Sequence, residues 1–299
     1  MQDLVKDNAP WAVPVTGALL NKIYKATGLV VTRETPEKIG RDTYIEEIKK
    51  SNLNPLMKAA FITNAEKIIK EYMNQKDIVK KAIPLLTEKD KPENIDEDWL
   101  MAFLDRARLI SDSEFQIIWA KILAEECREP GKISKQLLMT LAQMDKVDAE
   151  VFAGVCNFSL KVQTESEVDF HPLIDLTKIK TYYSKYNITS DKLRDLVALG
   201  LIDFEDLSEI GFKLSVEDPI LSISYGSKMI NCSGPCFTIG IGAVILKKTG
   251  KELLRIITTT QQPNFLDEIV MPYLIRYWEN EKMKQEFQNT LTELDKTYK

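Results

Sequence analysis

Residues 110–123, Ile110-Ser-Asp-Ser-Glu-Phe-Gln-Ile-Ile-Trp-Ala-Lys-Ile-Leu123, combine a helix start with an apolar face. Ser111 and Glu114 have the spacing of a capping box, in which each side chain accepts a backbone N–H of the other's residue. After this start, large apolar residues recur at intervals of three and one, the spacing of one side of an α-helix: Phe115, Ile118, Trp119, Ile122 and Leu123. We therefore expect a helix that begins at Ser111 and buries this side.

Helix signals continue on both sides of this stretch. Acidic residues at 96–98 stand where a helix N-terminus favours negative charge. Glu129-Pro-Gly131 is a stop signal, and Ser134 and Asp145 can cap two further helices. Four helices with short connections predict a helical bundle over residues 91–165. Its expected core is Trp99, Phe103, Phe115, Trp119, Leu138, Leu141 and Phe152.

The N-terminal region, residues 1–90, also has a helical pattern. Apolar residues recur at helical spacing through 42–85, where Pro55 either breaks the pattern or occupies the first turn of a new helix. Residues 87–94 hold five charges, a proline and an asparagine but no large apolar residue. This composition predicts a solvated linker and a domain boundary.

From residue 166 onwards the pattern mixes helix with strand. A helix ends at Gly200, and a Gly226-Ser227 turn separates two apolar runs in the manner of a hairpin. Gly240-x-Gly242 predicts a bend in a strand. The expected elements are a helix from 190, strands at 219–225, 228–232 and 237–246, a helix at 247–256 and a last helix at 265–298. We expect residues 166–299 to form a winged-helix-like α+β unit with a C-terminal helix, within a mainly α chain.

Charge and cysteine content exclude several classes of protein. The chain has 299 residues, with Lys+Arg 40 against Asp+Glu 45 and a net charge of −5. This charge is spread over both halves, so no basic half indicates nucleic-acid binding. No cationic and apolar leader follows Met1, and the four cysteines are scattered. Both features favour a reducing, cytoplasmic location.

Few residues offer metal or catalytic chemistry. Cys232 and Cys236 could supply two thiolates, but a structural zinc site needs four ligands. His171 is the single imidazole, and no serine or cysteine stands in a nucleophile-elbow context beside it. Five carboxylates could belong to a di-metal helical bundle: Asp96, Glu97, Asp98, Glu125 and Glu126. Such bundles also need Glu-x-x-His motifs, and this sequence has none. We therefore expect no metal, no cofactor and no enzymatic activity.

Several short motifs carry a resemblance to a known family. They are D-E-D-W-L at 96–100, Q-I-I-W-A-K-I-L-A-E-E at 116–126, E-P-G-K-I-S at 129–134 and D-A-E-V-F at 148–152. This stretch resembles a bacterial protein family defined only as a domain of unknown function, and L-G-L-I and T-G-K-E-L-L extend the likeness more loosely. The resemblance implies a mostly helical intracellular bacterial protein without an assigned activity. More distantly, the chain is similar to abortive-infection proteins, which act in phage defence.

Three functions follow as expectations. The first is a non-enzymatic interaction protein, in phage defence, that binds a protein partner or a second copy of itself. Its expected contact residues are Leu199, Leu201 and Phe204. The acidic residues that follow them, Asp203, Glu205, Asp206 and Glu209, would repel a DNA duplex, which favours this function over DNA binding.

The two alternatives use other parts of the chain. A winged-helix DNA-binding regulator would make its phosphate contacts through Lys185, Lys192, Arg194 and Lys228. A membrane-surface effector would use residues 10–31, which place Leu19, Leu20, Ile23 and Tyr24 on one side of a helix. A helix that docks on its own protein shows the same single apolar stripe, so this pattern favours docking.

Overall fold

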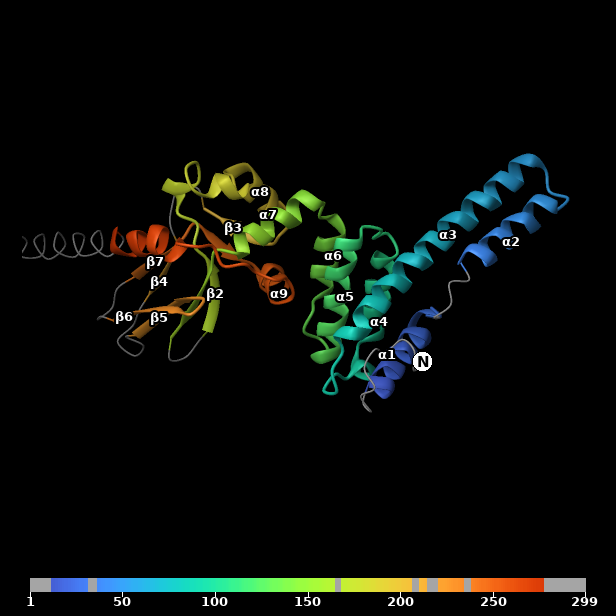
Figure 1. The fold of residues 1–299 in the computed structure, drawn as a ribbon, viewed down its shortest axis with the longest axis horizontal. Helices are drawn as coiled ribbons and strands as arrows, with labels where there is room; N and C mark the ends of the chain where they lie inside the picture. Colours follow the sequence, from blue (N-terminus) through green and yellow to red (C-terminus); the bar gives the residue numbers. More distant parts are fainter. Residues whose placement is uncertain are drawn as a thin grey trace, which may run out of the picture. The chain divides into compact units, whose positions relative to one another are not determined.

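The computed structural model describes residues 12–31, 37–164, 168–205, 210–213, 220–233 and 238–276. The chain forms two compact units, Met1–Ala142 (unit 1) and Gln143–Lys299 (unit 2). Figure 1 shows helices throughout unit 1 and helices with antiparallel strands in unit 2, so the chain is mainly helical, as expected. The sequence predicted boundaries after residues 90 and 165 instead, and the packing described below explains the difference.

Unit 1 is all helical in the part that the structure describes. Its helices begin where local signals predict them. Asn54 caps the helix that starts at Pro55, and Asp96 caps the helix that starts at Glu97. The hydroxyl of Ser134 accepts the N–H of Leu137 at 3.2 Å, at the start of a third helix. The elements are α1 (Ala12–Thr27), α2 (Glu37–Lys50), α3 (Pro55–Ala82), η2 (Ile83–Leu85), η3 (Pro92–Asn94), α4 (Glu97–Ala107), α5 (Ser113–Arg128) and α6 (Lys135–Gln143).

The start of α5 differs from the expected capping box. Asp112, not Ser111, is the N-cap residue, and its Oδ1 accepts the N–H groups of Glu114 at 2.9 Å and Phe115 at 3.0 Å. A carboxylate satisfies two orphan donors at once and also favours the positive end of the helix dipole, which explains why it displaces the serine.

The core of unit 1 is built around stacked aromatic rings. Trp99 stacks on Phe103 and Trp119 packs against it at a tilt of 54°, with ring centroids 5.3 Å from Phe103 in both cases. All three are buried, as are Leu138 and Leu141, which confirms these members of the expected core. Two members differ. Phe115 is only half-buried, and Phe152 lies in unit 2 because its helix packs there on α8 (Ser190–Ala198).

Residues 87–94 are mostly exposed, as expected, but they are anchored in unit 1 and do not separate two compact units. The carboxylate of Asp90 accepts the N–H of Thr87 at 2.7 Å and its hydroxyl at 3.0 Å, and the N–H of Lys91 donates to the carbonyl of Cys127 at 2.7 Å. Asp90 and Pro92 are buried. Local hydrogen bonds satisfy the charged and backbone groups, so this polar segment can lie against α5 instead of separating two domains.

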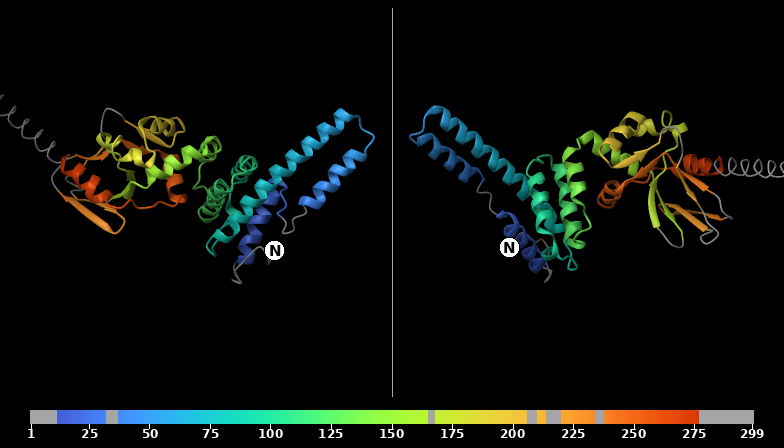
Figure 2. Two further views of the ribbon diagram at one scale, coloured as in Figure 1. Left: turned by 45° about the horizontal axis from the view of Figure 1, so that its top comes forward. Right: turned by 180° about the vertical axis from the view of Figure 1, so that it is seen from behind.

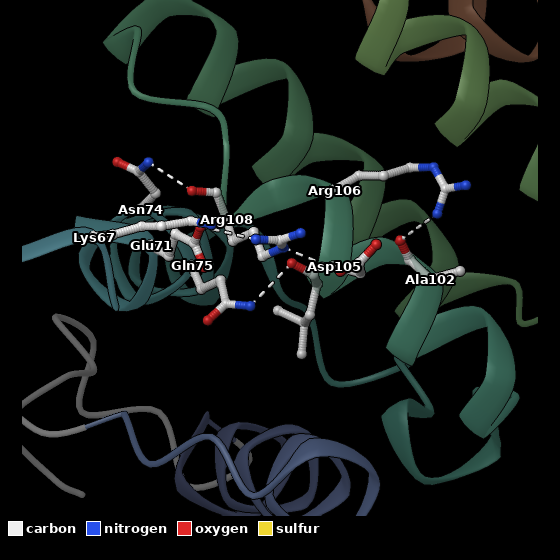
Figure 3. A network of polar contacts seen from close by, with 9 residues as sticks. Lys67, Glu71, Asn74, Gln75, Ala102, Asp105, Arg106 and Arg108 are labelled. Carbon is white, nitrogen blue, oxygen red and sulfur yellow. Dashed lines mark hydrogen bonds and ion pairs between the residues drawn. The ribbon is translucent and has the colours of Figure 1, made fainter. Parts of the chain in front are cut away.

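Polar side chains of α3 complete the end of α4 (Figure 3). Asn74 donates to the carbonyl of Arg108 at 2.8 Å, and Gln75 donates to the carbonyl of Leu104 at 2.9 Å. These carbonyls lie at the C-terminal end of the helix, where α-helical partners run out. The guanidinium of Arg108 also pairs with Glu71 at 2.8 Å. The network joins α3 to α4 across the expected boundary at residue 90.

The helix within residues 10–31 docks on its own unit. α1 packs on α4 and η3, where Leu19 and Ile23 are fully buried, and Lys22 pairs with Glu97 at 3.2 Å. Tyr24, the fourth member of the expected stripe, is 57% exposed. Within the described ranges, no helix combines the length and apolar character needed to cross a bilayer.

Unit 2 combines helices with antiparallel sheets. Its strands pair in three groups, in the orders β2-β1-β5-β6, β3-β8 and β4-β7. The elements are α7 (Lys146–Cys156), β1 (Ser159–Gln163), β2 (Val168–Pro172), η4 (Leu176–Lys178), η5 (Tyr183–Tyr186), α8, β3 (Ile202–Phe204), β4 (Ile210–Lys213), β5 (Ile220–Tyr225), β6 (Lys228–Ser233), β7 (Thr238–Gly242), β8 (Val244–Leu246), α9 (Lys248–Ile256) and η6 (Leu266–Val270). Helical residues continue from η6 to 276, and the rest of the expected C-terminal helix lies outside the described residues.

The predicted hairpin is present and is longer than expected. β5 and β6 pair around Gly226, whose φ is +63°. The β4–β7 and β3–β8 pairs are also antiparallel and enclose the β5–β6 pair in chain order, with a change of register between successive pairs, so three nested pairs run from β3–β8 at the base to β5–β6 at the tip. Near its tip β5 also pairs with β1, which adds β1 and β2 to the sheet. The strand bends at Gly242, with φ +98°, as the sequence predicted.

The base of this hairpin touches the start of α9. The N–H of Lys247 donates to the carbonyl of Leu201 at 3.0 Å, and the hydroxyl of Thr249 donates to the carbonyl of Gly200. Elsewhere, Phe158 is the centre of an aromatic core, with ring centroids 5.1 Å from Tyr183 and 4.9 Å from Phe265. These contacts join the start of α9 to the base of the hairpin, and Phe158 to η5 and to Phe265 before η6.

Candidate functional site

The four cations expected to bind DNA do not converge. Lys192 donates to the side chain of Asn187, Arg194 pairs with Asp191 at 3.0 Å, and Lys228 pairs with Asp267 at 2.9 Å. Lys185 is exposed on η5. The β5–β6 hairpin, which carries Lys228, lies on the opposite side of unit 2 from α8 in all views of Figures 1 and 2. Three of these side chains are thus engaged by neighbours, and the four do not form one surface.

The expected protein-contact residues differ in how far they are buried. Leu201 is fully buried beneath α9, so it belongs to the core and cannot contact a partner. Leu199 and Phe204 are half-buried. Asp206 and Glu209, the acidic residues beyond them, lie outside the described residues.

The candidate ligands of a metal have structural roles where the structure describes them. Cys127 and Cys156 are buried, and burial raises the pKa of both thiols. Cys236 and the side chain of Cys232 lie outside the described part of the chain. Within that part, no three His, Cys, Asp or Glu side chains are grouped to hold a metal ion.

Glu126 shows what one of the candidate carboxylates does. It is fully buried, and its two oxygens accept the N–H groups of Gly131 at 2.6 Å and Ile133 at 3.0 Å. Glu126 therefore holds the turn between α5 and α6. The sequence did not indicate this role, because a buried glutamate paired with backbone N–H groups leaves no pattern in the sequence.

A cavity of about 430 Å³ in unit 2 is the strongest candidate site. It is lined by the end of α7, strands β1, β2 and β5, helix α9 and residues 259–261. Its basic side chains come from two elements: Lys161 of β1, and Lys251 and Arg255 of α9, which are four residues apart and so share a helix face. Asp169 is its only acidic lining residue among those described. The cavity is thus positively charged within an acidic chain.

One of these cations is engaged and two are available. Lys251 donates to Asp169 Oδ2, and the Nε2 atom of the buried His171 lies 3.4 Å from the same oxygen. Burial alone would raise the pKa of Asp169, but hydrogen bonds from Lys251 and the N–H of Phe170 outweigh it and hold this pKa below its usual value. Among the residues that the structure describes, neither Lys161 nor Arg255 forms an ion pair.

Hydrogen bonds hold the wall of the cavity in place. The hydroxyl of Tyr225 donates to the carbonyl of Asn157 at 2.7 Å and accepts the N–H of Gln262 at 2.6 Å. The side chain of Asn157 in turn accepts the N–H of Thr260 at 2.7 Å. The loop after α9 is therefore tied to the sheet and to the end of α7, so the cavity is formed before any ligand arrives.

Strand register sets the floor of the cavity. Lys161 is paired with Phe170 on one side and with Ser224 on the other, so these three side chains point to the same face of the sheet. Phe170 is 45% exposed and Val168, two residues before it on the same face, is 50% exposed. The floor therefore offers an aromatic ring and an aliphatic side chain beside a lysine.

These residues were not singled out from the sequence. The T-G-K-E-L-L-R stretch that contains Lys251 and Arg255 suggested only the start of a helix. The four-residue spacing of these two cations is a usable signal, but it does not show that β1 and β2 face them. That information lies in the antiparallel register.

The fold and this cavity define a mainly helical protein with an antiparallel sheet and a basic site in its C-terminal unit. The family described as Protein of unknown function (DUF2806) matches residues 46–270. The chain belongs to this family. A search of curated proteins and a search of solved structures found no match to this chain.

Proposed function

We propose that the chain is a non-enzymatic binding protein and that the cavity of unit 2 holds a small phosphate-bearing ligand. The observation that carries this proposal is the convergence of Lys161, Lys251 and Arg255 on one preformed cavity with a single carboxylate, Asp169. Lysine and arginine side chains bind phosphate oxygens through charge-assisted hydrogen bonds. The sequence favours a protein partner instead of this ligand. It could not indicate the ligand, because the cavity exists only once β1, β2 and α9 are brought together.

The size and lining of the cavity favour a small molecule over a DNA duplex. A volume of about 430 Å³ lies in the range that small-molecule sites occupy. Duplex binding needs many phosphate contacts along an extended surface, whereas these cations surround one enclosed space. Ser224 also lines it, and its hydroxyl can donate to a ligand oxygen.

Calorimetric titration of the full chain with pyrophosphate tests this function. We expect saturable binding that weakens with salt. Lys161→Gln and Arg255→Gln should each weaken it roughly tenfold, because each removes a charge-assisted contact. Lys185→Gln is the matched control, since it removes one exposed positive charge of unit 2 away from the cavity. Absence of binding at millimolar pyrophosphate, or equal weakening by the control, would refute the proposal. Tighter binding of an acidic peptide than of pyrophosphate would also refute it.

A further inference from the structure

We infer that the ligand of the unit 2 cavity is a single nucleotide, with its base stacked on Phe170 and its phosphates on the cations of β1 and α9. This inference rests on the proposed function. It adds an aromatic base to the phosphate-bearing ligand, because a phosphate site alone does not explain an exposed aromatic ring in the cavity. The evidence is the position of an exposed ring directly across from Lys161, in the cavity that Lys251 and Arg255 also line.

The exposure of Phe170 is the first argument. Other aromatic side chains of unit 2 are packed in its core, such as Phe158, Tyr183 and Phe265, which are fully buried. Phe170 instead is 45% exposed, and it lines the cavity. Exposing an aromatic ring forgoes the stabilisation that its burial would give. A ligand with a flat apolar face would cover this ring, whereas inorganic phosphate would not.

The neighbours of Phe170 supply the second argument. Lys161 lies directly across from it in the β1–β2 register, and Ser224 lies on the far side of Lys161. A base stacked on the ring would therefore have an ammonium group and a hydroxyl group next to it. Arg255 of α9 and Gln261 line the same cavity, and the amide of Gln261 can both donate to and accept from a base edge. A nucleotide has an aromatic face, hydroxyl groups and phosphates, which match the ring, the polar groups and the cations that line the cavity.

The cavity also indicates one nucleotide and not a strand. Single-stranded nucleic acid is bound by successive aromatic platforms along an open basic groove. Here the other aromatic lining residue, Tyr225, is 8% exposed, and its hydroxyl is engaged by Asn157 and Gln262. Phe170 is thus the single stacking surface that the described lining offers.

Titration of the full chain with ribonucleoside diphosphates and with pyrophosphate tests this inference. Pyrophosphate provides the charge without the base, so the comparison isolates stacking. We expect at least one of ADP, GDP, CDP and UDP to bind about tenfold more tightly than pyrophosphate, because stacking on a protein ring contributes in this range. Phe170→Ala should remove this advantage and leave the pyrophosphate affinity unchanged. Phe170→Trp should retain it.

The outcomes separate the two proposals. If pyrophosphate binds and no nucleoside diphosphate binds more tightly, the nucleotide inference is overturned and the phosphate site stands. If neither binds, both fall. An unstructured twelve-nucleotide DNA that binds over tenfold more tightly than every nucleoside diphosphate would overturn the single-nucleotide occupant. Circular dichroism checks that Phe170→Ala folds, which its exposed position predicts.

Discussion

Gly250→Ala tests the contact between the start of α9 and the base of the long hairpin. A Cβ atom at position 250 would lie 2.1 Å from the carbonyl oxygen of Leu201 and 3.1 Å from its carbonyl carbon. That oxygen is held in place because it accepts the N–H of Lys247 at 3.0 Å. The obstacle is therefore backbone that already has a hydrogen-bonding role, and it cannot move away in the manner of a flexible side chain.

The magnitude follows from two opposing terms. Alanine stabilises a helix by about 1 kcal/mol relative to glycine. Overpacking costs roughly 1–3 kcal/mol and occasionally more, and a contact this short belongs at the upper end of that range. We expect a net loss of about 2 kcal/mol or more in the stability of unit 2. The steric cost is larger than the gain in helix propensity, because α9 must move away from Leu201 to make room for the methyl group.

Gly154→Ala in α7 is the matched control within the same unit. A Cβ atom there would meet its nearest neighbour, the carbonyl oxygen of Tyr186, at an ordinary 3.6 Å. This variant keeps the helical gain without the clash, so we expect stabilisation by about 0.5–1 kcal/mol. The two substitutions, chemically identical, should therefore differ in stability by roughly 3 kcal/mol.

Hydrogen–deuterium exchange is the suitable assay, because a chain of two units need not unfold in one transition. Exchange of peptides from α8 to β3 and from β8 to α9 reports the opening free energy of this contact. A difference of roughly 3 kcal/mol corresponds to about two orders of magnitude in protection. Gly250→Ala protection equal to or above that of Gly154→Ala would refute the reasoning.

Three further predictions concern buried groups. Trp119→Ala should destabilise unit 1 by about 3–5 kcal/mol in urea unfolding, because the ring is fully buried beside Phe103; a loss below about 1 kcal/mol would exclude Trp119 from the core. Glu126→Ala should cost about 3 kcal/mol in the same measurement, since it leaves two backbone N–H groups without their acceptor, and Glu126→Gln should cost less; equal losses would contradict the acceptor role. Because the folded pKa of Asp169 is lowered, its contribution is complete above the unfolded value of about 3.9 and is lost as pH falls through the folded value. Asp169→Asn should therefore flatten the acid limb of the stability curve of unit 2, while Asp191→Asn, whose side chain is 93% exposed, should not.

Helix ends were predictable where the signal is local. Asn54 and Pro55 start α3, Asp145 forms a capping box with Asp148, and Gly200 ends α8 with φ +73°. These motifs depend on residues within one turn, so they act before any tertiary contact forms. The same locality explains the one error at a cap, because Ser111 and Asp112 are adjacent and both can cap.

The domain boundary was less predictable because polarity does not show burial. Residues 87–94 have the composition of a linker, yet Asp90 is buried and satisfied by Thr87. The helical bundle expected over residues 91–165 is split between unit 1 and unit 2 for a related reason. Residues of α7 carry a helical apolar face, but a face does not specify its partner, and this one packs on α8 in unit 2.

The sequence by itself determined the mainly helical character, several of the helix ends and the Gly226-Ser227 hairpin, since each follows from periodicity or from turn chemistry over a few residues. Only the tertiary structure decided the candidate site. Lys161, Phe170 and Arg255 lie on separate elements, and a one-residue shift of the β1–β2 register would place Lys161 and Phe170 on opposite faces of the sheet. That register is set by burial of the opposite face, where Leu160, Val162 and Ile223 pack. The chemistry of the cavity is therefore a product of which apolar face the sheet buries.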